Sequence, residues 1–202
     1  MKIIKILIAI VFAGALLAYG LHHLRTNPHD VALYMISTPE SPVLLESFRV
    51  NGQELLVEPI LITGRGSEGE LGGIAARMKP ERGVVREGTL VLRIGWVDLV
   101  TKNAFVGHMT IPGNTLHPKS ILDRTADVRL AFVTGGWLVQ TPPFSPIPNN
   151  PFESALTRIC GEPTLESNVS VNTHLRNHPD LLARISSLQA GLSGRPSCRN
   201  GA

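Results

Sequence analysis

The chain has 202 residues, of which 43% are hydrophobic and 17% are charged, and its formal net charge at pH 7 is +3. Lys2, Lys5 and Arg25 account for this whole excess, because the remaining 16 basic residues equal the 16 acidic ones in number. A neutral domain with interspersed charges lacks the basic surface that nucleic-acid binding requires, so we expect no nucleic-acid partner. The length fits a single domain with a hydrophobic core.

The first 25 residues have the pattern of an export signal or a membrane anchor. Lys2 and Lys5 precede an uninterrupted apolar run of 16 residues from Ile6 to Leu21. This run is longer than many signal-peptide cores and shorter than the roughly 20 residues that usually cross a bilayer. The basic residues before it outweigh the one arginine after it, which predicts a single-pass inner-membrane protein with a cytoplasmic N-terminus and a periplasmic domain. The alternative is cleavage near Gly20, which would release a soluble periplasmic protein.

A polar tether at 26–30 leads into a single domain that we place at 31–202. Residues 31–36 have the composition of a first strand. Two more strand-like runs, at 44–50 and 53–58, flank the dipeptide Asn51-Gly52. Because both central residues of a type I′ turn need a positive φ, this dipeptide predicts a β-hairpin.

Residues 64–88 contain seven glycines and many charges, which predicts a loop. The segment 64–69 has the literal pattern G-x-G-x-x-G, which in a dinucleotide site turns from a strand into a helix that binds a pyrophosphate. Here Pro59 interrupts the preceding apolar run, and Gly72 and Gly73 weaken the following helix. We therefore interpret this segment as a flexible glycine loop and expect no cofactor.

The most apolar part of the domain follows this loop. Period-two alternation over 89–99 predicts a half-buried strand that places Trp96 in the core. A short polar connection joins it to a second strand at 104–111, which completes a hairpin. A third hairpin joins 128–133 to 137–141 through a pair of glycines.

After residue 141 the strand-like patterns end, and a proline-rich segment and helical patterns follow. Five prolines between 142 and 151 exclude regular structure. Helices are predicted at 153–159 and at 179–191, the latter with a proline in its first turn and a glycine at its end. The predicted fold is mainly β (α+β), an antiparallel sheet or sandwich of six to eight strands with one or two C-terminal helices, preceded by a single N-terminal apolar helix. The long loops at 64–88 and 142–151 are either binding surfaces or poorly ordered connections.

The chain has two cysteines, Cys160 and Cys198. In an oxidising compartment an isolated pair usually forms a disulfide, so we predict a bridge that pins the C-terminal tail to the domain. The alternative is a redox or metal-binding pair, which the wide spacing and the lack of a C-x-x-C motif disfavour.

No nucleophile motif such as G-x-S-x-G or S-x-x-K occurs in the sequence. Acid–base chemistry would have to come from residues that are distant in sequence, and the candidates are Asp98, Asp123, His108 and His117. A small envelope hydrolase would need two or more of them within hydrogen-bonding reach of each other.

His174 and His178 have the i, i+4 spacing of a metal-binding pair on a helix. However, Pro179 follows directly, and a residue before proline avoids helical geometry. We therefore place the pair in a surface turn outside the last helix and expect no metal site.

Residues 85–140 resemble an uncharacterised family of small proteobacterial envelope proteins, often lipoproteins, known only as a domain of unknown function. The stretches that carry the resemblance are LVLRIGWVDL with Trp96, AFVGHMTIP, and LAFVTGGWLVQ with its paired glycines. The family typically has a lipoprotein cysteine at the end of the leader, which this chain lacks. The resemblance implies an envelope location without an established activity, and related small envelope proteins include immunity factors that neutralise secreted toxins.

These observations predict an exported, membrane-anchored, non-enzymatic protein-binding domain. Its partners would be the inner membrane, through residues 6–21, and a protein of the envelope. Such a domain would act as an immunity or inhibitor protein, or as an accessory subunit of an envelope or secretion complex. The alternative function is a small envelope hydrolase whose site assembles only in the fold.

Overall fold

The computed structural model describes residues 10–20, 30–64, 88–120, 123, 125–143, 151–164, 171–176, 178–191 and 198. Residues 10–20 are helical. Within these ranges, no helix is long and apolar enough to cross a membrane. Both ends of the predicted membrane segment 6–21 lie outside the described residues, as do most of the tether, most of the loop 64–88 and residues 144–150 of the proline-rich segment.

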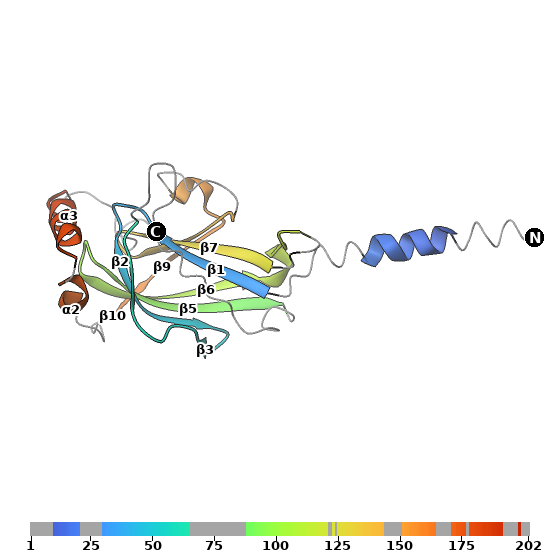
Figure 1. The fold of residues 1–202 in the computed structure, drawn as a ribbon, viewed down its shortest axis with the longest axis horizontal. Coiled ribbons are helices and arrows are strands. Elements are labelled where there is room, and N and C mark those ends of the chain that lie inside the picture. Colours follow the sequence, from blue (N-terminus) through green and yellow to red (C-terminus); the bar gives the residue numbers. More distant parts are fainter. Residues whose placement is uncertain are drawn as a thin grey trace, which may run out of the picture.

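The domain is a β-sandwich of two sheets (Figure 1). The four-stranded sheet has the strand order β1-β7-β8-β9. β1 and β7 are parallel, with Asp30 opposite Thr125, and the other pairs are antiparallel. These strands are β1 (Asp30–Ser37), β7 (Thr125–Val133), β8 (Trp137–Thr141) and β9 (Thr157–Cys160).

The six-stranded sheet has the order β10-β6-β5-β2-β3, and β4 also pairs with β2. All its pairs are antiparallel, and a bulge interrupts the β2–β5 register between Leu45 and Ser47. Its strands are β2 (Val43–Val50), β3 (Gln53–Glu54), β4 (Ile60–Ile62), β5 (Thr89–Asp98), β6 (Asn103–Pro112) and β10 (Glu162–Thr164).

The core lies between the two sheets and is centred on Trp96, which is fully buried. The ring of Trp96 lies 5.7 Å from that of Phe105 on β6 and 5.5 Å from that of Phe132 on β7. Gly136 and Gly161 border these rings so closely that a Cβ at either position would come within 3 Å of them. Trp96 therefore joins both sheets, as the alternation of its strand predicts.

Short helices cover part of each outer face. On the six-stranded sheet, α2 and α3 bury Leu44, Val97, Leu99 and Ala104 beneath Leu175, Leu181 and Ile185. On the four-stranded sheet, Phe152 and Ala155 pack against Ile36, Ala131 and Val139. The helical segments are η1 (Gly113–Thr115), η2 (Pro151–Ser154), α2 (Val171–Leu175) and α3 (Pro179–Ala190).

The mainly β fold, the C-terminal helix at 179–190 and the three hairpins are confirmed. Asn51 and Gly52 have φ values of 49° and 85°, as the type I′ turn requires. The described part of the chain contains ten strands against the six to eight expected. The surplus consists of strands of two to four residues, such as β4 and β10, which are too short to give a recognisable alternation.

Two predicted elements are wrong. The strand expected at 53–58 covers only Gln53 and Glu54, which pair with the C-terminal end of β2. The chain then leaves β2 and returns as β4, which pairs with the N-terminal end of β2. The helix expected at 153–159 is a 3₁₀ turn followed by β9. There, pairing with β8 and the packing of Ile159 against the core override the helical preference of the local sequence.

Candidate functional site

The four candidate hydrolase residues lie in three separate parts of the sandwich. His108 is exposed on the outer face of the six-stranded sheet, and Asp98 is buried at the end of β5. His117 and Asp123 belong to the connection between β6 and β7. Asp98 contacts the turn after β7, whereas Asp123 precedes this nine-residue strand, which spans about 30 Å. The structure thus separates the two carboxylates instead of pairing them.

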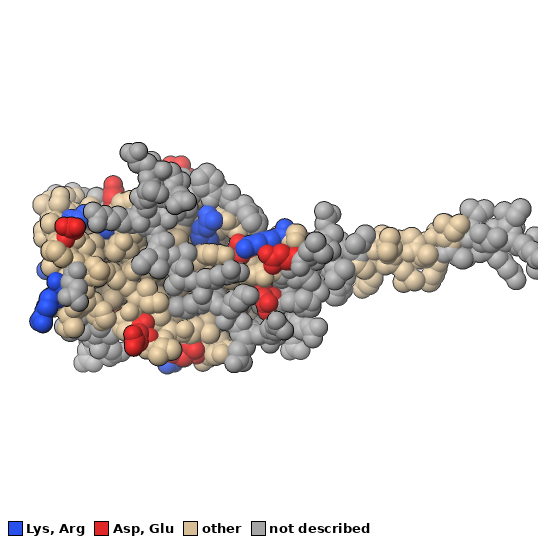
Figure 2. Space-filling view, viewed as in Figure 1, with Lys and Arg blue, Asp and Glu red and all other residues tan. Residues whose placement is uncertain are grey.

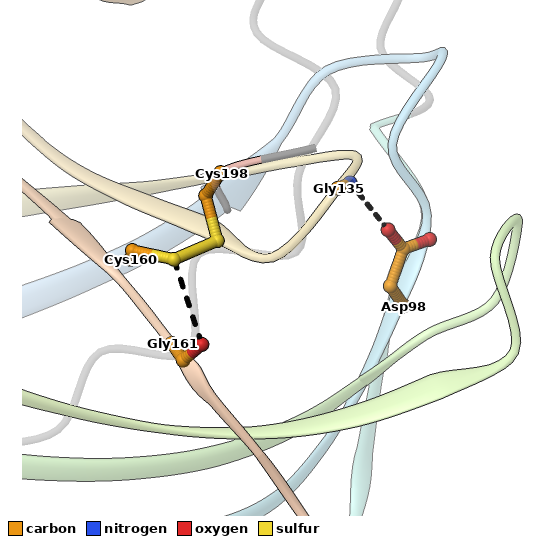
Figure 3. Close-up of a disulfide and its surroundings, with 5 residues drawn as sticks. All are labelled: Asp98, Gly135, Cys160, Gly161 and Cys198. Carbon is orange, nitrogen blue, oxygen red and sulfur yellow. Dashed lines mark hydrogen bonds between the residues drawn. A yellow bond between two sulfur atoms is a disulfide. The ribbon is translucent and has the colours of Figure 1, made fainter. Parts of the chain in front are cut away.

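Asp98 is the centre of a hydrogen-bonded junction between two hairpin turns (Figure 3). Its Oδ1 accepts hydrogen bonds from the backbone N–H groups of Val100 at 2.9 Å and Thr101 at 3.1 Å. Its Oδ2 accepts one from Gly135, in the β7–β8 turn, at 2.8 Å. Only 1% of Asp98 is exposed, so the carboxylate is enclosed by its own donors.

Burial raises the pKa of the Asp98 carboxyl above its ordinary value of 3.8, although the hydrogen bonds from Gly135, Thr101 and Val100 oppose the shift. A raised pKa in a cleft is a common mark of a catalytic acid. Here both oxygens already accept backbone hydrogen bonds and face the interior. The arrangement suits a structural acceptor that fixes the β5–β6 turn against the β7–β8 turn.

The predicted disulfide is part of the same junction. Cys160 and Cys198 are bonded, with their Cα atoms 5.3 Å apart, which confirms the prediction. The backbone N–H of Cys198 donates to the carbonyl oxygen of Gly135 at 3.0 Å, and that of Gly161 donates to Gly136 at 2.8 Å. The bridge therefore holds Cys198 at the end of β9, next to the turn that also contacts Asp98 (Figure 3).

A hydroxyl network completes the junction on the side of the β1–β2 turn. Ser41 Oγ accepts a hydrogen bond from the backbone N–H of Thr134 at 2.9 Å, and the Thr134 hydroxyl donates to the carbonyl oxygen of Glu40. The N–H of Leu99 donates to the carbonyl oxygen of Pro42. Three turns that are distant in sequence thus meet at one end of the sandwich.

A second polar cluster lies at the four-stranded sheet. Lys119 Nζ is 3.0 Å from Asp127 Oδ2 and 6.0 Å from the centre of the Tyr34 ring. The hydrogen bond to Asp127 raises the pKa of Lys119, whereas burial lowers the pKa of Arg129, which lies opposite Tyr34 on β7. The Lys119–Asp127 ion pair attaches the β6–β7 connection to this sheet.

The histidine pair does not share a helix. His174 lies in α2, which ends at Leu175, and His178 is the residue that precedes α3. This confirms the predicted break before Pro179, but the surface turn expected for both histidines is wrong for His174, because residues 171–175 form a helix of their own. Among the residues with described positions, no three His, Cys, Asp or Glu side chains are grouped as a metal ion would require. Of the G-x-G-x-x-G motif, only Gly64 lies inside the described residues.

Sequence reasoning missed a row of basic side chains on the outer face of the six-stranded sheet. Arg49 on β2 is opposite Arg93 on β5, and Arg93 is opposite His108 on β6. The alternation within each strand places these residues outward. The alignment of Arg49 with Arg93 depends on a register between strands 44 residues apart, which the sequence alone does not reveal.

Comparisons with protein-family models, with curated proteins and with solved structures gave no match.

Proposed function

We propose that this chain is an exported, membrane-anchored protein whose β-sandwich binds another protein on the periplasmic side of the inner membrane, without enzymatic activity. It would act as an immunity or inhibitor protein, or as an accessory subunit of an envelope or secretion complex. The observation that carries the location is the Cys160–Cys198 disulfide, because such bridges persist in oxidising compartments. The basic and apolar leader before residue 26 supports the same location.

Two features support binding over catalysis. The hydrolase candidates Asp98 and Asp123 lie at opposite ends of β7, and Asp98 is occupied by three backbone donors. By contrast, β2, β5 and β6 present exposed side chains on the part of their outer face beside the α2–α3 cover. On the side of the molecule seen in Figure 2, the described acidic and basic residues are intermixed, which suits a protein partner better than nucleic acid.

Chemical crosslinking in native membranes, followed by affinity purification of the full chain, tests this function. We expect one partner protein in stoichiometric amount. Recovery of the monomer alone, at a crosslinker dose that captures a known membrane complex in the same sample, would overturn the proposal.

Intact-mass measurement of the purified chain tests the anchor separately. We expect the mass of the uncleaved chain. A mass that corresponds to loss of the residues up to Gly20 would show a cleaved leader and a soluble periplasmic domain.

A further inference from the structure

Three basic side chains form a row across three neighbouring strands, Arg49 on β2, Arg93 on β5 and His108 on β6. All three are exposed. Residues directly opposite each other in an antiparallel pair point to the same face, with Cβ atoms about 5 Å apart. The row therefore presents its side chains side by side on the outer face of the six-stranded sheet.

The charges in this row are not balanced within the described structure. Arg49 Nε forms an ion pair with Glu54 Oε2 on β3, and the other oxygen of Glu54 accepts a hydrogen bond from the backbone N–H of Phe48. Arg93 has neither an ion pair nor a hydrogen-bonded side-chain partner among the described residues. Like charges directly opposite each other destabilise a strand pair, so the juxtaposition of Arg49 and Arg93 lowers the stability of the β2–β5 pair.

A carboxylate from outside would supply the missing counter-charge. The guanidinium of arginine offers a planar fork of N–H donors that matches a carboxylate in bidentate fashion. Glu54 already holds Arg49 in place, which leaves Arg93 as the group that meets an incoming acid. Arginine is also among the residues that contribute most to binding energy at protein interfaces.

The surroundings of Arg93 fit a protein contact. Val91 lies two residues earlier on the same face and is 46% exposed, and Thr110 lies opposite it on β6. In the other direction along β5, Val97 is covered by the α2–α3 cluster. An apolar side chain lies here next to an arginine that has no partner among the described residues, beside a covered area, and this composition fits a protein-binding patch.

We propose that this patch, made of Arg49, Val91, Arg93, His108 and Thr110, binds an acidic surface of the protein partner, with Arg93 as its central contact; the proposal rests on the proposed function. An anionic membrane is the less suitable ligand. Attraction to a lipid surface needs a cluster of several basic residues, whereas Glu54 and Glu162 are exposed on strands of this same sheet.

The test is site-specific photo-crosslinking of the full chain in native membranes. The photoreactive residue replaces Val91 in the patch or, as a matched control, Leu182 on α3, which is 41% exposed. We expect an adduct with one protein from position 91 and none from position 182. The crosslinked peptide of the partner should come from a segment rich in Asp and Glu.

Charge reversal identifies the contact. In the chain that carries the photoreactive residue at position 91, Arg93→Glu should reduce the adduct at least about tenfold, because it sets a like charge against the carboxylate of the partner. The matched control, Arg158→Glu, reverses an exposed strand arginine on the other sheet and should change the adduct less than about twofold. Arg93→Glu places a carboxylate opposite Arg49, so it should keep the fold, which tryptophan fluorescence verifies.

The remaining outcomes separate this inference from the proposed function. A protein adduct from position 182 but not 91, or one that persists in Arg93→Glu, would overturn the patch and leave the binding function intact. Adducts with lipid alone from position 91 would also overturn the patch. Lack of a stoichiometric partner in the chemical-crosslinking experiment would overturn the binding function itself.

Discussion

Replacement of Asp98 should destabilise the domain strongly, because this carboxylate accepts three backbone hydrogen bonds from two different turns. Of the three donors, Val100 and Gly135 are buried, so neither N–H reaches water when its acceptor is removed. A hydrogen bond is worth about 1 kcal/mol net, and a buried donor left without an acceptor costs about 1–3 kcal/mol. Asp98→Ala should therefore lower the free energy of unfolding by about 3–5 kcal/mol.

The variant Asp98→Asn distinguishes the contributions that the two turns make to stability. The amide oxygen can still accept from Val100 and Thr101, but the amide nitrogen then faces the N–H of Gly135 as a second donor. One hydrogen bond is lost instead of three, so we expect a loss of about 1–3 kcal/mol.

Urea unfolding of the full chain in a mild non-ionic detergent, followed by the fluorescence of its two tryptophans, measures these losses. The control is Glu162→Ala, which removes an exposed acid on an edge strand and should change stability by less than about 0.5 kcal/mol. If Asp98→Ala were as stable as this control, the junction would make no net contribution and the reasoning would be refuted.

The pH dependence gives a second, independent test of Asp98. Because burial raises its pKa in the folded state above the ordinary 3.8, the folded protein holds this proton more tightly than the unfolded chain does. The resulting stability is present in full below pH 3.8 and is lost as the pH rises through the folded pKa. The free energy of unfolding of the wild type minus that of Asp98→Asn should therefore fall as the pH rises from 3.8 through the folded pKa. An increase of this difference with pH would contradict a raised pKa for Asp98.

The remaining predictions concern the same end of the sandwich. Removal of the disulfide in the double variant Cys160→Ser, Cys198→Ser should cost up to about 4 kcal/mol in urea unfolding, from the loop entropy of its 38-residue separation. This loss should not add to that of Asp98→Asn, because both contacts act on one turn; strict additivity would rule out the coupling. Gly136→Ala should cost more than Gly52→Ala in the same assay, since both have φ near 90° but only the former places a Cβ 2.5 Å from a core phenylalanine ring.

Local patterns were sufficient to predict much of the fold. Asn51-Gly52 and the glycine pair before Trp137 carry turn chemistry that acts within a few residues, so their hairpins follow from the sequence. The period-two pattern around Trp96 likewise predicts which face is buried. The disulfide could be predicted from the number of cysteines, since two cysteines allow a single pairing within the chain.

The strand β1 was predicted but its pairing was not, and β9 was not predicted as a strand; both depend on partners distant in sequence. β1 pairs in parallel with β7 nearly 100 residues later, and a parallel pair has no turn to announce it. Thr157–Cys160 forms β9 because it pairs with β8, although its sequence favours a helix as much as a strand. Contacts with distant strands determine the secondary structure and pairing of such segments, and these contacts cannot be inferred from a single sequence.

The same limit applies to Asp98, whose place among the hydrolase candidates came from residue type alone, and to Arg93, which was overlooked. Both lie on β5, five residues apart, and the sequence ranks the carboxylate as the chemical candidate. The fold reverses this ranking, because turns from three regions close around Asp98 and remove it from solvent, while strand register leaves Arg93 exposed between two other basic residues. A buried charge with all its donors supplied contributes to structure, whereas an exposed charge that has no partner among the described residues has interaction energy left for another protein. The exposed row on the six-stranded sheet is therefore the place where we propose to test for binding, and Asp98 is the place to test for stability.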